Sequence, residues 1–188
     1  MHIAIAGNIG SGKTTLAGHL AKHLNYEVEY EDPTTNPYIF DFYDDMQRWS
    51  FNLQIHFLNT RLKQLIQIQG AGKDLVQDRT IYEDAEIFVP NLLAMGMLSQ
   101  RDYNTYTSLF DSVIKLVRPP DLLIYLRASI STLVDQIAER AREYEDNIRI
   151  DYLRRLNERY DEWFVSYNLG NKIDIVVDKL NFKDNPED

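Results

Sequence analysis

Short apolar segments of strand length alternate along the chain with longer segments in which apolar residues recur at helical spacing. The pattern predicts strands over residues 2–6, 28–31, 74–78, 121–126 and 172–177. It predicts helices over residues 15–24, 46–68, 82–93, 101–117, 131–140 and 151–167. Short apolar strands that alternate with helices are typical of a parallel sheet covered on both faces. We therefore expect a three-layer α/β fold, a five-stranded parallel sheet flanked by helices, in a single domain over residues 1–188.

The longest predicted helix, residues 46–68, carries Gln54 and Arg61 among mostly apolar positions. Seven residues span two helical turns, so the two side chains share one face and lie roughly 10 Å apart along it. Polar residues on such a stripe are suited to reading a ligand. They also fit positions that flank the core and reach solvent, and periodicity alone slightly favours this second interpretation.

The charge balance is acidic, with 20 lysines and arginines against 29 aspartates and glutamates and a net charge of −9. A nucleic acid polymer favours a basic partner, so the balance argues against one, but a small phosphate ligand needs only a local positive pocket. The chain has no cysteine, which excludes disulfides and thiolate chemistry. No apolar segment is of membrane-spanning length and the first strand begins at residue 2, so we expect a cytoplasmic protein without a membrane partner.

Residues 7–15 form the motif around which the other features are arranged. They read Gly7-Asn8-Ile9-Gly10-Ser11-Gly12-Lys13-Thr14-Thr15 and match the P-loop pattern G-x-x-x-x-G-K-[ST] between a predicted strand and a predicted helix. Glycines let backbone N–H groups surround a polyphosphate at the positive end of the helix. Lys13 adds a charge that reaches the β- and γ-phosphates, and the Thr14 hydroxyl suits a Mg²⁺ ligand. The alternative is a chance glycine-rich turn, but strand, loop and helix follow in the required order, so we expect this segment to bind ATP or another nucleoside triphosphate.

Acidic residues stand at the ends of two predicted strands, where open α/β sheets bind their ligands. Glu31 is a candidate general base, although exposed acids at strand ends are common. Asp78 is a candidate Mg²⁺ ligand, bound directly or through water. Arg79 directly after it suits orientation of a carboxylate or of a transferred phosphoryl group. The alternative for this second segment is that Asp78 or Thr80 caps the following helix.

Arg140 and Arg142 lie among acidic residues and, being two apart, do not share a helix face. A bend at this point would let both converge on one phosphate group, whereas the alternative interpretation is a solvated run of charges.

A small ATP-binding domain of this kind is expected to be a switch or a kinase. Residues 171–174, Asn-Lys-Ile-Asp, imitate the guanine-reading N-K-x-D, but they precede the last strand and the chain has no D-x-x-G, so we treat the match as coincidence. A hydroxyl acceptor must lose a proton, and Glu31 oriented by Arg79 fits that need. Arg79 with Arg140 and Arg142 would instead suit a monophosphate acceptor, and the residues alone leave both kinase types open.

Several ordered motifs together resemble the deoxyribonucleoside kinase family, the P-loop enzymes that include deoxycytidine, deoxyguanosine and deoxyadenosine kinases. The resemblance covers nearly the full length and rests on the P-loop, Glu31, Asn36-Pro37-Tyr38, Tyr43, Arg48-Trp49-Ser50-Phe51, Gln54, Arg61, Asp78-Arg79-Thr80-Ile81-Tyr82, Asp84, Phe88 and Arg140-x-Arg142. The spacing between Tyr43, Gln54 and Arg61 agrees with the family, as does the spacing from Asp78 to Asp84 and Phe88.

The resemblance implies a mechanism for phosphoryl transfer. Glu31 takes the proton from the 5′-hydroxyl of a deoxynucleoside, and Arg79 positions Glu31 and steadies the developing charge. Thr14 and Asp78 hold Mg²⁺ on ATP, the phosphate donor. The common E-R-S triplet is Asp78-Arg79-Thr80 here, and the shorter acid suits a metal held through water. The family's Glu-Pro is Glu31-Asp32-Pro33, and the spacing to Asn36 favours Glu31 over Asp32 as the base.

The resemblance also assigns the lid and the sugar contacts. Arg140 and Arg142 belong to a lid at about residues 140–148 that closes over the phosphates and excludes water. Gln136 stands where many relatives carry a first lid arginine. Tyr43 and Glu145 are similar to the pair that hydrogen-bonds the sugar 3′-hydroxyl. Because family members are usually homodimers joined through helices, we expect a homodimer.

For the base, the resemblance implies that Gln54 reads the edge and that Phe88 stacks on the ring. An amide matches the donor and acceptor pattern that adenine and cytosine both offer, and it can flip for guanine. Arg61 and Asp84 together resemble family members that phosphorylate deoxyadenosine, deoxyguanosine and deoxycytidine, and we expect deoxyadenosine first. The alternatives are a nucleoside monophosphate kinase of thymidylate-kinase type, which would lack this set of residues, and a non-catalytic nucleotide-binding module.

Overall fold

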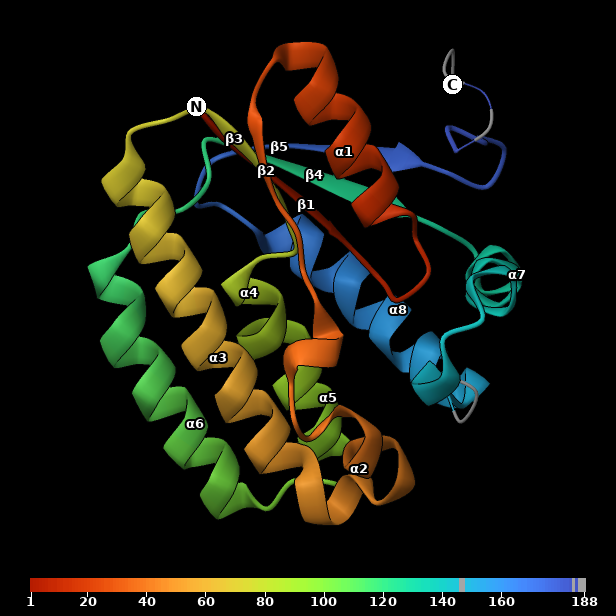
Figure 1. Cartoon of the computed structure of the whole chain (residues 1–188). Coiled ribbons are helices and arrows are strands. Elements are labelled where there is room, and N and C mark those ends of the chain that lie inside the picture. Colours follow the sequence, from red (N-terminus) through yellow and green to blue (C-terminus); the bar gives the residue numbers. More distant parts are fainter. Residues whose placement is uncertain (146–147, 184, 186–188) are drawn as a thin grey trace.

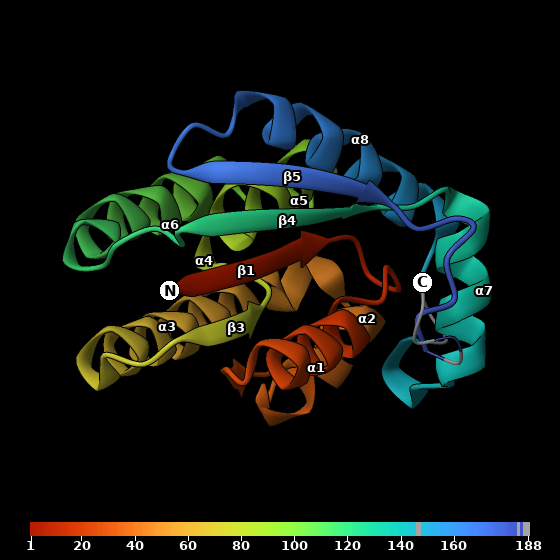
Figure 2. The ribbon, with the colours of Figure 1, turned by 90° about the horizontal axis from the view of Figure 1, so that it is seen from above.

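The computed structural model describes residues 1–145, 148–183 and 185. At its centre a five-stranded sheet has the order β2-β3-β1-β4-β5, with every neighbouring pair parallel (Figures 1 and 2). The strands are β1 (His2–Gly7), β2 (Glu27–Glu29), β3 (Leu75–Asp78), β4 (Leu122–Arg127) and β5 (Asn171–Val176). The predicted three-layer fold and its five parallel strands are confirmed.

Helices connect these strands and cover both faces of the sheet. They are α1 (Lys13–Leu24), α2 (Ile39–Asp44), α3 (Met46–Ala71), α4 (Ile81–Glu83), α5 (Val89–Ala94), α6 (Gln100–Val113), α7 (Ile130–Arg140) and α8 (Ile150–Ser166). Three short 3₁₀ turns accompany them, η1 (Pro33–Thr35), η3 (Ile114–Leu116) and η4 (Glu143–Glu145). The π-helical segment η2 (Asp84–Phe88) joins α4 to α5, so the helix predicted over residues 82–93 is divided into three parts.

The alternation of side chains along β1 divides the interior into two cores. Ile3 and Ile5 pack on one face of the sheet with apolar residues of α1 and α7. Ala4 and Ala6 face the opposite layer, to which α3, α5, α6 and α8 contribute, and the small alanines leave room for its larger side chains. Figure 1 shows α1 on one side of the strands and α3, α6 and α8 on the other.

Two helix ends differ from the expected ones for identifiable reasons. α3 continues through Gly70 and Ala71 and ends at Gly72, whose left-handed backbone (φ 62°) terminates it. At the end of α8, the Lys172 amino group donates to the carbonyl oxygens of Phe164, Val165 and Tyr167. Lys172 therefore caps a helix. Residues 171–174 form the first part of β5 and do not precede it as expected, so they still do not follow the end of a strand.

Parallel pairing brings the carboxyl ends of the strands to one edge of the sheet. Ile5 is in register with Asp78 on one side of β1, and Gly7 with Leu126 on the other. The P-loop follows β1 at this edge, and the chain after β2 reaches it through Glu31. Within the described ranges no helix is both long and apolar enough to cross a membrane.

Candidate active site

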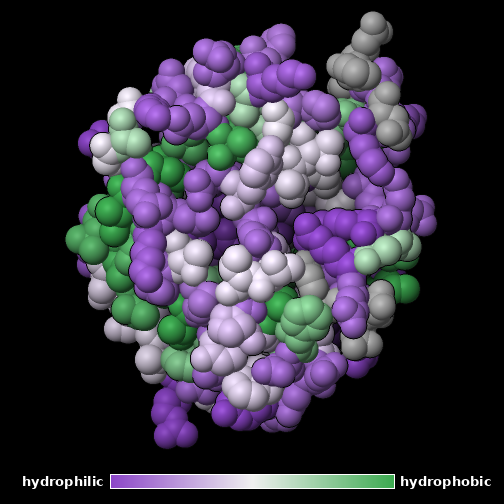
Figure 3. Space-filling model, in the orientation of Figure 1, coloured by the Kyte–Doolittle hydropathy of each residue, from purple (hydrophilic) through white to green (hydrophobic). Residues whose placement is uncertain are grey.

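A cavity lies at the carboxyl edge of the sheet and extends down between the helices. Its empty space, with the open solvent at its mouth included, is about 700 Å³. Hydrophilic residues predominate around the recess at the middle of the face in Figure 3. The cavity is lined by Ile9, Gly10, Lys13, Thr14, Glu31, Pro33, Ile39, Phe42, Tyr43, Leu53, Gln54, Phe57, Arg61, Arg79, Asp84, Phe88, Arg140, Arg142, Glu145 and Tyr152. We call it the acceptor cavity.

A second cavity lies on the other side of the P-loop. It is lined by Gly10, Gly12, Lys13, Thr14, Thr15, Gln136, Glu139, Arg140, Arg142, Leu180, Asn181, Phe182 and Lys183. We call it the donor cavity. Lys13, Thr14 and the two arginines line both cavities. Two ligands bound in these cavities would therefore meet at a phosphate-binding loop and three cationic side chains.

The P-loop adopts the backbone that its glycines permit. Gly12 has φ 89°, and a Cβ there would lie 2.8 Å from the ring of Phe182, so both backbone and packing require glycine. The Asn8 side chain points away from the cavities and donates to the Leu153 carbonyl oxygen of α8 at 2.9 Å. Of the nine predicted loop residues, Gly7, Asn8 and Ser11 line neither cavity, whereas the other six line at least one.

Lys13 lies at the junction of the two cavities and is buried. Its amino group donates to the Asn8 carbonyl oxygen at 2.9 Å. Burial, together with the charge of Arg79, lowers the pKa of Lys13 to about 7. A polyphosphate here would favour the charged form of this side chain, so affinity for the nucleotide and protonation of Lys13 reinforce each other.

Thr14 and Asp78 approach each other as a Mg²⁺ site requires. The Thr14 hydroxyl donates to Asp78 Oδ2 at 2.6 Å, while Asp78 Oδ1 is buried without a hydrogen-bond partner. Burial raises the pKa of Asp78, so the nearby positive charges and hydrogen bonds do not fully offset the cost of burying its negative charge in the free protein. A hydroxyl and an unsatisfied carboxylate oxygen beside a P-loop fit Mg²⁺, whose remaining ligands are commonly phosphate oxygens and water. Within the described ranges no group of three His, Asp or Glu side chains could hold a metal.

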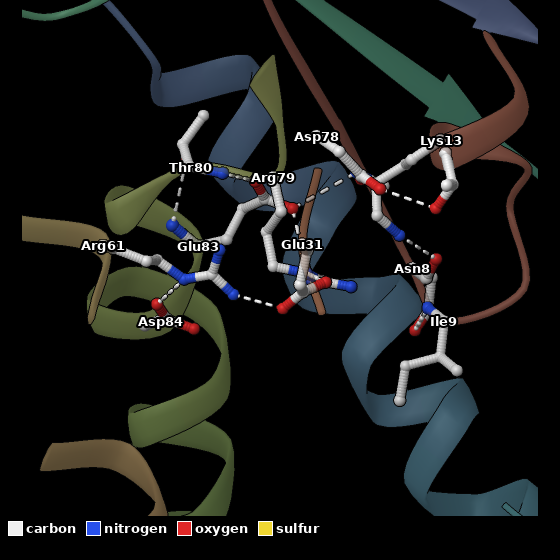
Figure 4. A network of polar contacts seen from close by, with 12 residues as sticks. Asn8, Ile9, Lys13, Glu31, Arg61, Asp78, Arg79, Thr80, Glu83 and Asp84 are labelled. Atoms are coloured by element: carbon white, nitrogen blue, oxygen red, sulfur yellow. Dashed lines mark hydrogen bonds and ion pairs between the residues drawn. The ribbon is translucent and has the colours of Figure 1, made fainter. Parts of the chain in front are cut away.

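Glu31 is held between two arginines that come from distant parts of the chain (Figure 4). Arg79 Nε donates to Glu31 Oε2 at 2.8 Å, and Arg61 Nη2 donates to Glu31 Oε1. Arg61 also donates through Nε to Asp84, so one guanidinium joins both carboxylates. Burial would raise the pKa of Glu31, but the charges of Arg79 and then Arg61 outweigh it and hold this pKa well below the ordinary range. Glu31 is therefore an ionised carboxylate with a fixed orientation.

Glu31 and Asp32 have different surroundings in the structure. β2 ends at Glu29, and Glu31 follows it in an irregular segment that lines the acceptor cavity. Asp32 is exposed and accepts hydrogen bonds from the backbone N–H and the hydroxyl of Thr34, which caps η1. The helix after β3 is capped in turn by Thr80, which forms a capping box with Glu83. Arg79 lines the acceptor cavity, and Asp78 bonds to Thr14 of the P-loop.

Arg140 and Arg142 both approach Glu145, because the chain bends at the residue between them. Ala141 ends α7 with a left-handed backbone (φ 49°). Arg140 donates to both carboxylate oxygens of Glu145, at 3.1 and 2.5 Å, and Arg142 Nη1 lies 3.7 Å from Glu145 Oε1. The two arginines are thus paired with a buried acid that lines the acceptor cavity. Residues 146 and 147 of the predicted lid lie outside the described residues.

The far end of the acceptor cavity contains the remaining predicted residues. Gln54 is 2% exposed, and its Oε1 is buried without a hydrogen-bond partner. It lines the cavity with Arg61, Asp84, Phe88 and Tyr43, so the interpretation that Gln54 and Arg61 reach solvent is wrong. Burial, opposed by Arg61, raises the pKa of Asp84 to about 6.

Sequence reasoning missed several residues of the site. Phe57 lines the acceptor cavity and packs against Arg61, whose guanidinium carbon lies 5.4 Å from the centre of the ring. Tyr152 of α8 lines the same cavity, and Phe182 lines the donor cavity from beyond β5. Phe57 and Tyr152 lie on helices whose apolar positions the sequence pattern assigns to the core, and Phe182 lies beyond the last predicted strand, so no local signal marks them as site residues.

Comparison with known proteins agrees with this geometry. The sequence model of the family described as deoxynucleoside kinase matches residues 3–188. Deoxyadenosine/deoxycytidine kinase of Bacillus subtilis (strain 168) is 41% identical over 88% of this chain and 77% of the relative. Deoxyadenosine kinase of Dictyostelium discoideum is 44% identical over 86% of this chain and 66% of the relative. The solved structure of deoxyadenosine kinase from M. mycoides with bound dATP has a TM-score of 0.85 and 35% identity, over 98% of this chain and 94% of that chain.

The parallel sheet and the two cavities that meet at the P-loop define a protein with the P-loop kinase fold. The chain belongs to the deoxynucleoside kinase family, and it is an enzyme that phosphorylates a deoxynucleoside.

Proposed function

We propose that the enzyme transfers the γ-phosphate of ATP to the 5′-hydroxyl of deoxyadenosine, with deoxyguanosine and deoxycytidine as further acceptors. The observation that carries this proposal is the ionised carboxylate of Glu31, held by two arginines where the acceptor cavity approaches Lys13. A hydroxyl acceptor needs such a base, and a monophosphate acceptor does not. The names of relatives that are deoxyadenosine or deoxyadenosine/deoxycytidine kinases support deoxyadenosine as the first choice.

In the proposed reaction Glu31 accepts the hydroxyl proton while the 5′-oxygen bonds to the γ-phosphorus and the bond to the leaving ADP oxygen breaks. A carboxylate with a low pKa suits a loose transition state, in which the proton leaves late and little activation of the nucleophile is needed. Arg79 keeps Glu31 in place and, with Lys13, compensates the charge that develops on the transferred group.

We assign Thr14 and Asp78 to Mg²⁺ and residues 140–145 to a lid. Bound Mg²⁺ would supply charge neutralisation on the phosphates of ATP. Arg140 and Arg142 line both cavities, and in the free enzyme they pair with Glu145. When phosphates enter, these arginines can turn toward them, which leaves Glu145 available, with Tyr43, for the 3′-hydroxyl.

The base is expected between Gln54 and Phe88. The unsatisfied Oε1 of Gln54 is an acceptor that an exocyclic amine on the base would satisfy. The ion pair between Arg61 and Asp84 lies at the far end of the cavity. Because each of these side chains already has a partner of opposite charge, an uncharged base can bind beside them. Adenine and cytosine both offer an amine and a ring nitrogen that fit this arrangement.

A panel of acceptors tests the proposal. We expect ADP release from MgATP to be fastest, in kcat/KM, with deoxyadenosine, slower with deoxyguanosine and deoxycytidine, and negligible with thymidine and thymidine monophosphate. Chelation of Mg²⁺ with EDTA should abolish turnover. Turnover with thymidine monophosphate alone would identify a nucleoside monophosphate kinase, and no turnover with any acceptor would leave only nucleotide binding.

We also propose a homodimer formed through the outer face of α3 and α6. Its support is the family resemblance together with a groove on that face lined by Tyr38, Phe51, Asn52, Ile55, His56, Leu58, Asn59, Leu62, Leu109 and Val113. In sedimentation at micromolar concentration, Leu109→Glu should shift the protein toward its 22.0 kDa monomer. Leu116→Glu, at a leucine outside this groove that is 67% exposed, should not. A wild-type mass of 22.0 kDa at every concentration would exclude the dimer.

A further inference from the structure

A further acidic residue, Glu83, lies behind the site and lines neither cavity. It is fully buried, with 0% of its surface exposed, on the short helix α4 (Figure 4). Its Oε2 accepts from the backbone N–H of Thr80 at 2.7 Å, and its Oε1 accepts from Gly7 N–H at 3.3 Å. One buried side chain thus contacts both the start of the P-loop and the segment that carries Arg79.

Tyr160 of α8 links this carboxylate to Arg79. Arg79 Nη1 lies 2.7 Å from the Tyr160 hydroxyl, which lies 2.8 Å from Glu83 Oε1. A guanidinium only donates, so the hydroxyl accepts from Arg79 and directs its own proton to Glu83. Burial raises the pKa of Tyr160, which keeps the required proton on its oxygen.

These contacts fix the Arg79 side chain from the side opposite to Glu31. Its Nε donates to Glu31 at 2.8 Å while Nη1 is directed to Tyr160, and the Phe88 ring lies 4.8 Å from the guanidinium carbon. The Arg79 backbone has φ 70°, so Arg79 lies in neither a helix nor a strand. The orientation of its side chain therefore depends on the contacts that the side chain makes. Without the Tyr160 hydroxyl, Nη1 would retain only the 3.5 Å contact with Glu83.

We propose that Tyr160 and Glu83 are positioning residues that orient Arg79 toward Glu31 and tie both to the first glycine of the P-loop. This inference rests on the proposed function, in which Arg79 positions Glu31 and compensates the charge of the transferred group. Neither residue touches a substrate cavity, so they act through Arg79 and the loop.

Tyr160→Phe tests the inference, since it removes the hydroxyl and keeps the ring. We expect kcat with deoxyadenosine to fall about 10–100-fold with both KM values little changed, as for displacement of a catalytic group by a fraction of an ångström. Tyr125→Phe is the matched control. Tyr125 stacks on Tyr160 with ring centres 5.8 Å apart, but its hydroxyl bonds to Asp161, away from Arg79. A merely structural role would instead lower the melting temperature of both variants alike and leave kcat at the control value, which would overturn the inference.

A double variant separates positioning from an independent effect. If Tyr160 acts through Arg79, then Tyr160→Phe should cost almost nothing further in an Arg79→Lys background, because the coupled guanidinium is already gone. If the wild type is active but the losses of kcat in the two single variants multiply in the double variant, the inference is overturned. Failure of the wild type to phosphorylate any deoxynucleoside would instead overturn the proposed function itself.

Discussion

Glu31→Gln should lower kcat for deoxyadenosine about 10²–10⁴-fold, the usual cost of losing a general base. Glutamine keeps the shape of the side chain and an oxygen that accepts from Arg79, but it cannot take the hydroxyl proton. KM for deoxyadenosine and for MgATP should therefore change little. Steady-state rates of ADP release, with each substrate varied in turn, measure this.

Asp32→Asn is the control for that experiment. It removes a carboxylate from the adjacent position, and asparagine still accepts the Thr34 N–H that caps η1. Its kcat should stay close to that of the wild type. Glu31→Gln with undiminished kcat would exclude Glu31 as the base, and a collapse in Asp32→Asn instead would transfer that role to its neighbour.

Arg79→Gln should lower kcat about 10²–10³-fold, the range seen when a donor to a developing charge is removed. It should also change the pH profile. In the wild type the pKa of Glu31 lies below the ordinary value of about 4.3, so Glu31 contributes no acid limb to kcat above about pH 5. Arg79 is the largest of the charges that oppose the effect of burial, and its removal raises this pKa. The rate of the variant should then fall as the pH is lowered through the new value, since the protonated acid cannot accept a proton.

Measuring kcat from about pH 5 to 9 in both proteins tests this expectation. Arg149→Gln, at an exposed arginine that pairs with Asp151, is the control and should reproduce the wild-type profile. An unchanged profile in Arg79→Gln would show that Arg79 does not set the charge of Glu31. Calorimetric binding of MgATP and a thermal melt establish that the variant is folded.

Local signals made much of this protein predictable. The P-loop has a mechanism and a fixed context, and the alternation of strands and helices allows few arrangements other than a parallel sheet. Arg140 and Arg142 were ambiguous because sequence cannot reveal the left-handed Ala141 or the partner Glu145. Gln54 and Arg61 were ambiguous because a helical stripe at the edge of a core and one that lines a cavity have the same period.

Other features depend on contacts between distant segments. The π-helical turn over residues 84–88 has no marked sequence signal, yet it carries Asp84 and Phe88 into the cavity. Glu83 and Tyr160 are 77 residues apart, and a buried glutamate on a short helix resembles an ordinary surface acid until its partners are known. The preferred base depends on distances within the cavity that residue types alone do not define.

The location of Glu31 beyond the end of β2 bears on how this chemistry could be moved to another scaffold. The strand does not set the position of the carboxylate; two guanidinium groups from α3 and from the turn after β3 do. A designer who copies only the loop that follows β2 would obtain an unanchored acid. A functional copy of the site would need three separate segments, which are the loop after β2, the part of α3 that carries Arg61 and the turn after β3. These segments would also have to keep their relative positions.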